Sequence, residues 1–299
     1  MILRGFKFIR GCLGLFLVII NLLVHATLTL IIGCLVWLIP DTLTVSLWAQ
    51  RFVLLIPTSW SQFNFWILKL NTFGKWDIQG PPTLSRRNWY MLISNHQSWL
   101  DILVLGGVFC QKIPPLKFFM KKELLWTLPI AGVCCYLLGY PFMARHTASD
   151  IRKNPALKGQ DIETTKKACE KFKRLPTTII NFVEGTRFTQ KKHDDQQSPF
   201  HHLLKPKTGG AAVVINEMEN CLNGILDVTI NYDTDDLSFF GLLSGDVRKI
   251  TVHYDVIPIT TEILGNYYED RQFRKRFQHW LNNIWQQKDT LLDELNHDR

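Results

Sequence analysis

NWYMLISNHQSWLD (Asn88–Asp101) passes from a short apolar run, through a polar turn, into the start of a helix. The run of residues 88–94 is rich in bulky apolar side chains and predicts a strand. Ser98 and Asp101 have the spacing of a capping box, in which a hydroxyl and an acid three residues apart satisfy free amides at a helix start. This order of strand, turn and helix predicts an α/β structure with functional side chains at strand-to-helix turns.

The rest of the chain repeats this alternation. Residues 115–120, 177–185, 225–233 and 249–259 predict further strands, and residues 161–174, 207–218 and 267–295 predict helices. The apolar run Leu124–Met143 is interrupted by prolines and glycines, and it predicts a buried or membrane-contacting helix followed by a strand. Residues 146–160 and 188–204 are polar and predict exposed loops. The predicted fold class is α/β, with a mixed sheet flanked by helices and an N-terminal hydrophobic helical hairpin.

The N-terminus predicts a membrane anchor. Arg4, Lys7 and Arg10 precede the apolar run Gly11–Ile39, which is longer than the roughly 20 residues that span a bilayer. The basic flank predicts a cytoplasmic N-terminus. Residues 46–70 are apolar but interrupted by polar side chains, and they predict an interfacial or re-entrant arm. We therefore expect residues 1–75 to anchor the chain in a membrane, and residues 76–299 to form the α/β domain with a C-terminal helix.

Composition narrows the class of partner. The 299 residues carry a formal charge of +8 and include ten Trp and 19 Phe. Basic charge with many aromatic side chains favours lipid headgroups, whereas the lack of an RNA-binding signature or a basic arm argues against a nucleic-acid partner. The seven cysteines are odd in number and lack a C-x-x-C spacing. They predict reduced thiols in a cytosol-facing protein, without a disulfide framework or a zinc site.

His96 and Asp101 form the first candidate site. A five-residue offset on an ideal helix turns through about 140°, so the two side chains meet only if His96 lies in the turn and Asp101 in the first helical turn. A carboxylate on one imidazole nitrogen fixes the tautomer and makes the other nitrogen a general base for a hydroxyl. The alternative is a helix-start acid beside an unrelated surface histidine. No G-x-S-x-G motif accompanies the pair, which weakens a serine-hydrolase interpretation.

FVEGTRF (Phe182–Phe188) forms the second candidate site, where a predicted strand runs into Glu184, Gly185, Thr186 and Arg187. The Arg187 guanidinium suits a phosphate or carboxylate, and glycine allows close backbone approach. The alternative is a tight turn with a Glu–Arg ion pair. Lys207 precedes a Gly-Gly turn into a helix and predicts either an anion site or a solvated loop.

His193, His201 and His202 fall in the polar segment 188–204. No carboxylate spacing accompanies them, so they predict a flexible loop and no metal site.

Together these motifs resemble the glycerolipid acyltransferases. NHQSWLD resembles the H-x4-D block of that family, and FVEGTR resembles its E-G-T-R block, with 88 residues from His96 to Glu184. GYPFMAR (139–145) lies between them, where the family carries glycine, an aromatic residue and arginine, although Ala144 stands where the family usually has a charge. LLKPKTGGA (203–211) and DVTINYD (227–233) resemble later blocks of the branch containing 1-acylglycerol-3-phosphate and lysocardiolipin acyltransferases.

The resemblance implies roles for named residues. His96 would be the base and Asp101 its orienting partner. The phosphorylated acceptor would be held by a set of six: Glu184, Gly185, Thr186, Arg187, Arg145 and Lys207.

The implied reaction moves an acyl chain from acyl-CoA or acyl carrier protein, as co-substrate, to a lysophospholipid, without a metal or other cofactor. The simplest acceptor is 1-acyl-sn-glycerol 3-phosphate, which would give phosphatidate; lysophosphatidylglycerol and lysocardiolipin are alternatives. A membrane-bound hydrolase and a non-catalytic lipid-binding protein are rival hypotheses. The implied location is a bacterial inner membrane, with the catalytic domain facing the cytoplasm.

Overall fold

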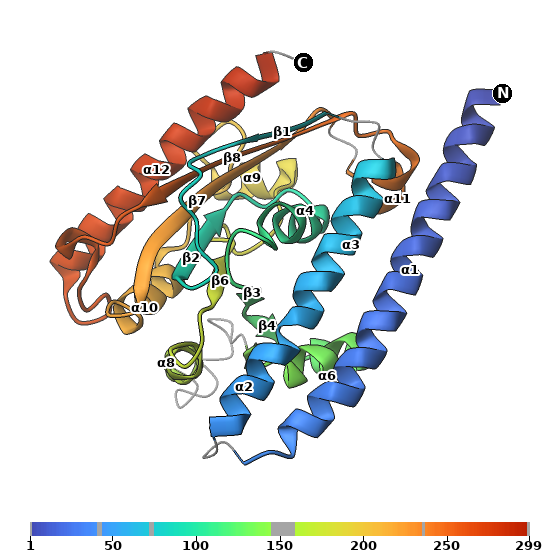
Figure 1. Ribbon diagram of the computed structural model, residues 1–299. Coiled ribbons are helices and arrows are strands. Elements are labelled where there is room, and N and C mark those ends of the chain that lie inside the picture. The colour runs from blue at the N-terminus through green and yellow to red at the C-terminus, as the bar shows by residue number, and fades with distance from the viewer. Residues whose placement is uncertain (1, 41–43, 72–74, 145–158, 235–236, 298–299) are drawn as a thin grey trace.

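The computed structural model describes residues 2–40, 44–71, 75–144, 159–234 and 237–297 (Figure 1). Among these residues, six strands form the main sheet in the order β1-β8-β7-β2-β6-β3. The strands are β1 (Lys75–Gln79), β2 (Trp89–Ser94), β3 (Leu116–Phe118), β6 (Thr178–Asn181), β7 (Leu222–Tyr232) and β8 (Lys249–Ile257). All neighbours pair in parallel except β7 and β8, which are antiparallel. The predicted mixed sheet is confirmed.

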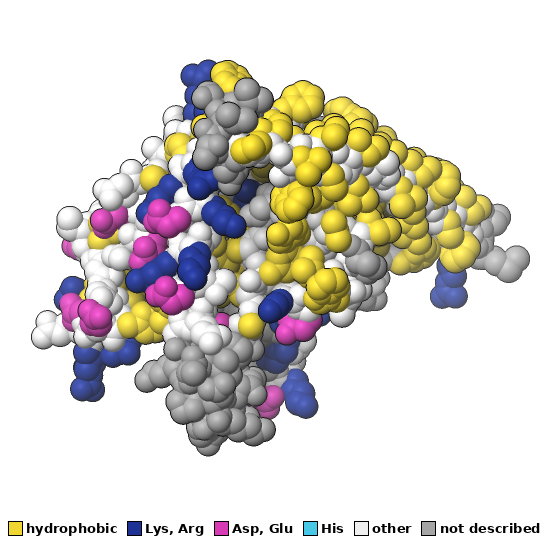
Figure 2. Space-filling model, turned by 90° about the horizontal axis from the view of Figure 1, so that it is seen from below, with side chains coloured by type: hydrophobic (Ala, Val, Ile, Leu, Met, Phe, Trp, Pro, Cys, Tyr) yellow, Lys and Arg dark blue, Asp and Glu magenta, His cyan; other side chains and the backbone are white. Residues whose placement is uncertain are grey.

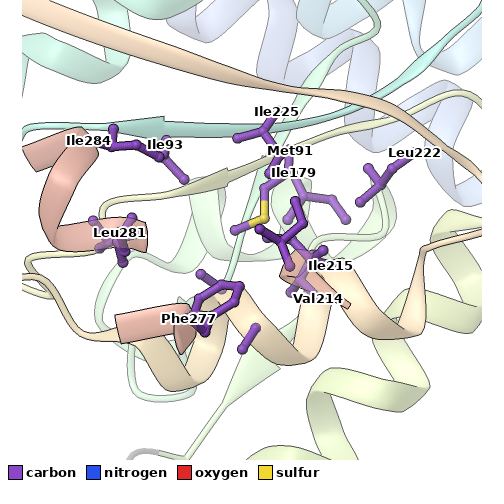
Figure 3. Packing of buried hydrophobic residues seen from close by; sticks show 14 of the residues in the cluster. Met91, Ile93, Ile179, Val214, Ile215, Leu222, Ile225, Phe277, Leu281 and Ile284 are labelled. Atoms are coloured by element: carbon purple, nitrogen blue, oxygen red, sulfur yellow. The ribbon is translucent and has the colours of Figure 1, made fainter. Parts of the chain in front are cut away.

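Helices cover both faces of this sheet (Figure 1). One face is packed by α8 (Gln160–Phe172), α10 (Thr208–Glu217) and α12 (Arg271–His297), and the other by α3 (Leu55–Asn71), α4 (Leu100–Phe109) and α11 (Phe239–Ser244). Side chains of a strand alternate between faces, so Met91 and Ile93 of β2 enter the first core and Tyr90 and Leu92 the second. Figure 3 shows the first core, with Ile284 of α12 near Ile93.

The N-terminal segment is a helical hairpin, as predicted. The long helix α1 (Ile2–Trp37) is followed by α2 (Thr44–Val53) and α3, and α1 lies beside α3 (Figure 1). His25 lies within the pair, where its Nε2 is 3.1 Å from the Ser59 hydroxyl. Within the described residues, α1 is the helix that is long and apolar enough to cross a membrane.

The middle of the chain forms a smaller layer. The short helices α5 (Leu124–Thr127) and α6 (Pro129–Leu137) lie between β4 (Met120–Lys121) and β5 (Phe142–Met143), which pair in parallel. This agrees with the predicted helix followed by a strand. A 3₁₀ turn, η2 (Thr261–Ile263), precedes α12.

Three elements differ from the predictions. The segment 188–204, expected to be a loop, contains α9 (Gln190–Gln196), which begins after a Thr189 cap and has no buried residues. A helix without an apolar face leaves no hydrophobic period in the sequence. The edge strand β1 and the short helix α11 were also not predicted; five and six residues are too short for a clear pattern.

Candidate active site

The two candidate motifs lie at one edge of the sheet. β2 ends at Ser94 and β6 at Asn181, and the two strands are parallel neighbours. Their carboxyl ends therefore point the same way, which places the segment from Asn95 to Asp101 beside the segment from Phe182 to Phe188. In open α/β sheets, this edge is where ligands bind.

The carboxylate of Asp101 binds the imidazole of His96. His96 Nδ1 lies 2.8 Å from Asp101 Oδ2, which also accepts the backbone N–H groups of Gln97 at 2.7 Å and Ser98 at 2.9 Å. The other oxygen, Oδ1, accepts the Tyr232 hydroxyl at 2.7 Å. Asp101 is 0% exposed, so these four donors take the place of its hydration. An ionised acceptor makes Nδ1 the protonated nitrogen of a neutral His96 ring and leaves Nε2 as a base.

The predicted capping box forms only in part. Asp101 binds the Ser98 amide as expected, but the Ser98 hydroxyl donates to the carbonyl of Leu237 at 3.2 Å. The helix then begins one residue later than predicted, at Leu100 after an N-cap at Trp99. Asp101 therefore stabilises the turn that carries His96 as well as the start of the helix.

Tyr232 was not predicted as a site residue. Burial, together with the neighbouring Asp101 charge, raises the pKa of its phenol above the ordinary value, so the hydroxyl remains a donor. Its position in the DVTINYD block gave no signal of this role, because it lies 131 residues from its partner.

The second motif surrounds the backbone of His96. The His96 amide donates to Glu184 Oε1 at 3.2 Å, and the Phe188 amide donates to the His96 carbonyl at 2.7 Å. The Phe182 ring stacks on the imidazole, with centroids 4.0 Å apart and an interplanar angle of 16°. Main chain and ring are thus fixed by three contacts from one loop, which restricts the direction of Nε2.

Of the two charged residues in the motif, Glu184 is the buried one. Its side chain is 1% exposed, and its second oxygen accepts the Leu204 amide at 3.1 Å. Burial raises its pKa to about 8, against the lowering effect of these two amide bonds. In this structure, the carboxyl group holds backbone amides and is closed to a solvent-borne acceptor. The alternative of a Glu–Arg ion pair is also absent, because the exposed Arg187 lies 4.9 Å over the Trp99 ring.

Basic side chains surround the remaining residues of the motif. Gly185 has a φ of +73°, and a Cβ added there would lie 3.1 Å from the Lys207 ammonium nitrogen. Lys192, which was not predicted, donates to the Thr186 hydroxyl at 2.8 Å and to the Arg187 carbonyl at 2.9 Å. Exposed Lys207 and Arg187 therefore flank a loop that positions His96.

The same part of the chain matches a known family. Residues 75–233, which are more than half of the sequence, match the sequence model of the family described as "Acyltransferase". The chain belongs to the acyltransferase family. This confirms the resemblance on which the glycerolipid acyltransferase prediction depended.

Individual relatives agree with this family. The chain is similar to 1-acyl-sn-glycerol-3-phosphate acyltransferase delta of Bos taurus, with 26% identity over 233 residues, 73% of this chain and 56% of that protein. It is 34% identical over 157 residues to 1-acyl-sn-glycerol-3-phosphate acyltransferase 3 of Arabidopsis thaliana, covering 47% of this chain and 37% of that protein. The chain spans about half the length of the curated relatives it matches.

A solved structure supports the fold. The crystal structure of the 1-acyl-sn-glycerophosphate acyltransferase PlsC from Thermotoga maritima superposes with a TM-score of 0.55 at 17% identity, covering 94% of this chain and 98% of that one. At this identity the likeness shows the architecture alone: a mixed α/β acyltransferase fold with an N-terminal helical segment.

Two hydrogen bonds from β7 also support the turn that carries His96. The Asn95 side chain accepts the Ile230 amide at 2.9 Å and donates to the Ile230 carbonyl at 2.8 Å. β7 is in turn bound to α12, where the buried Lys288 ammonium lies 2.7 Å from both the Val228 carbonyl and Asp227 Oδ1. The sequence did not predict that α12 supports the site.

α12 also holds the histidine-rich segment. Asp289 accepts the backbone amides of His201 at 2.7 Å and His202 at 2.8 Å, and Asp293 lies 2.9 Å from His202 Nε2. His201, Asp289 and Asp293 thus place one nitrogen and two oxygens within 4.8 Å of one another, which the sequence spacing did not predict. Asp289 is already satisfied by two amides, so this cluster serves first as a structural link. Arg145, the remaining candidate, lies outside the described residues.

Proposed function

We propose that this protein transfers an acyl chain from acyl-CoA or acyl carrier protein to the free hydroxyl of 1-acyl-sn-glycerol 3-phosphate, which gives phosphatidate. The observation that carries the proposal is the His96–Asp101 hydrogen bond beside the loop that bears Arg187, with Lys207 close to Gly185 of the same loop. Membership of the acyltransferase family and similarity to 1-acyl-sn-glycerol-3-phosphate acyltransferases support the same reaction. We propose residues 76–299 as the catalytic domain and residues 1–75 as its membrane anchor.

In the proposed mechanism, His96 Nε2 removes the proton of the acceptor hydroxyl while that oxygen attacks the thioester carbonyl. The tetrahedral intermediate then expels the thiolate, which takes the proton from the imidazolium as the C–S bond breaks. The Asp101 carboxylate stabilises the imidazolium between these steps. General base catalysis contributes about 10²–10⁴ in rate, and positioning contributes much of the rest. This mechanism uses neither a metal nor a bound cofactor.

Acceptor recognition is proposed for the cations at the motif. Arg187 and Lys207 would bind the phosphate, with Arg145 as a further contact, and a phosphate monoester gains more from them than a diester because it carries more charge. Gly185 and Thr186 would shape this loop. For Glu184 we propose a positioning role, through the His96 and Leu204 amides.

The membrane location belongs to the same proposal. A lyso-lipid stays in its leaflet while the thioester arrives from the aqueous side, so the enzyme has to work at an interface. The apolar α1 supports attachment to a membrane. We propose the bacterial inner membrane, with the catalytic domain facing the cytoplasm.

A thiol-release assay tests this function. Detergent-purified protein is given acyl-CoA or acyl carrier protein, with lysophosphatidate, lysophosphatidylglycerol or lysocardiolipin as acceptor. We expect release with lysophosphatidate, and its loss in His96→Ala. Thioester cleavage without any acceptor would instead support a hydrolase, and near-normal turnover in His96→Ala would contradict the mechanism.

A further inference from the structure

We infer that α5 and α6 form a second membrane-contacting element beside α1, so that one leaflet of an anionic phospholipid bilayer covers both. The inference rests on the membrane attachment proposed above. It goes further because α5 and α6 lie inside the α/β domain, between the His96 motif and the Glu184 motif, and not in the N-terminal anchor.

The sequence of this segment is unusual for the surface of a domain. Residues 124–144 contain no Asp, Glu, Lys, Arg or His. A helix at a water-facing surface normally carries charged and polar side chains on its outer side. A long uncharged segment is expected in a protein interior or against lipid.

The structure places much of this segment outside the core. Trp126 of α5 is 78% exposed, and Ile130 and Tyr136 of α6 are 53% and 54% exposed. Ile130, Val133 and Tyr136 recur every three residues, so they share one side of the helix. The outer side of α6 is therefore apolar, the reverse of a helix that faces water.

An adjoining side of α6 packs on α1. The Cys134 thiol contacts the Ala26 carbonyl at 3.7 Å, and a Cβ added to Gly33 would lie 3.2 Å from the Leu137 side chain. This packing makes the exposed side of α6 continuous with the apolar outer surface of α1, which includes Trp37. On the face seen in Figure 2, hydrophobic side chains gather over the part formed by these helices, whereas most of the charged side chains lie away from it.

Two features favour lipid as the occupant of this face. Exposed Lys121 and Lys122 lie just before α5, separated from it by the single acid Glu123, and aromatic Trp126 and Tyr136 lie on the apolar face itself. Basic and aromatic side chains bordering apolar ones match the headgroup region of an anionic membrane. The neighbouring α1 is itself long and apolar enough to cross a membrane.

The lengths of α5 and α6 limit how deeply they enter the bilayer. Helices of four and nine residues are far shorter than the roughly 20 residues of a membrane span, so α5 and α6 enter one leaflet only. Removing apolar surface from water lowers the free energy by about 25 cal/mol per Å², which favours this shallow insertion. The domain is then held to the leaflet at a second place besides its anchor.

Lipid-borne photolabelling tests the inference. The full chain is reconstituted in vesicles of phosphatidylcholine and phosphatidylglycerol that include a phosphatidylcholine with a diazirine in its acyl chain. After irradiation, labelled peptides are mapped by mass spectrometry. We expect label within residues 124–137 as well as within α1. Tyr268, which is 47% exposed near the start of α12, serves as the unlabelled control.

The outcomes separate this inference from the proposed function. Label in α1 but none in residues 124–137, with normal thiol release from the same sample, would overturn the inference alone. Absence of label from both segments would overturn the membrane attachment as well. An unlabelled face together with a dimer that Ile130→Glu dissociates would assign the face to a second copy of the chain, and would also overturn the inference.

A substitution that introduces a charge tests the inference in a second way. In Ile130→Glu, we expect label in residues 124–137 to fall about tenfold while label in α1 stays unchanged, because a carboxylate opposes insertion. Tyr268→Glu, the matched control, should alter neither. An unchanged unfolding temperature in detergent checks that the variant folds, since the Ile130 side chain is exposed. Persistent label in Ile130→Glu would show that the segment does not insert by this face.

Discussion

Tyr232 donates its buried hydroxyl to the one oxygen of Asp101 that His96 does not use. The carboxylate is thereby held from both sides, by the end of β7 and by the turn after β2. This arrangement restricts rotation of Asp101, and with it the orientation of the imidazole.

We predict that Tyr232→Phe lowers kcat by about tenfold with a smaller effect on acceptor KM. The variant removes a hydrogen bond to a charged group, which contributes about 1.5–3 kcal/mol, and leaves Asp101 less firmly held. Chemical denaturation and thiol-release kinetics measure both effects. Tyr254→Phe is the matched control: its buried hydroxyl donates to the Pro81 carbonyl at 3.1 Å, away from the site. Equal losses of kcat in the two variants would contradict the positioning role.

Glu184 makes stability depend on pH. Its pKa is raised by burial from 4.5 to about 8, so the folded protein keeps this proton over a range where the unfolded chain releases it. The unfolded state then binds fewer protons, and the free energy of unfolding falls as pH rises from about 4.5 to about 8. We expect Glu184→Gln to flatten this slope, although the free energy is lower throughout because its amide nitrogen faces a backbone N–H.

Denaturant titrations across this pH range measure the slope of each protein. Glu163→Gln, which replaces an exposed carboxylate on α8, is the control and should keep the wild-type slope. A slope that is unchanged in Glu184→Gln would show that another group is responsible.

Arg187 and Trp99 are predicted to act together on the acceptor. The guanidinium lies 4.9 Å over the indole ring, and this contact restricts its position beside the motif. Arg187→Ala should raise the acceptor KM by about ten- to a hundredfold, the equivalent of a lost charge-assisted hydrogen bond, with little change in kcat. Trp99→Ala should raise KM less, because the cation remains.

A second arginine over an aromatic ring provides the control for this prediction. Arg274 of α12 lies 6.0 Å over the ring of Tyr267, outside the motif, and Arg274→Ala should leave the acceptor KM unchanged. If Arg187→Ala lowers kcat and leaves KM unchanged, the cation acts on the chemical step and not on acceptor binding.

How much the sequence could predict depends on how local each feature is. The β2–turn–α4 order and the His96–Asp101 pairing follow from spacing within one turn, and both are found. Tyr232 and the burial of Glu184 depend on contacts made across the sheet, which no local period reports. The short edge strand β1 and the polar helix α9 were missed for a related reason, because neither has the long alternation that predicts an element.

The link from α12 to the site yields the last prediction. Asp289 is buried and accepts the amides of His201 and His202, and Leu204 of the same segment donates to Glu184, which holds the His96 amide. Asp289→Asn presents an N–H group to one of these donors and leaves it unsatisfied, at about 1–3 kcal/mol of stability.

Because this chain of contacts ends at His96, kcat in Asp289→Asn should fall by more than the loss of folded protein explains. Asp293→Asn, four residues along the same helix, is the matched control, since Asp293 contacts histidine side chains and no backbone amide. Unfolding in denaturant and kcat per folded molecule separate the two effects. If the two variants have the same kcat per folded molecule, α12 stabilises the fold without positioning the base.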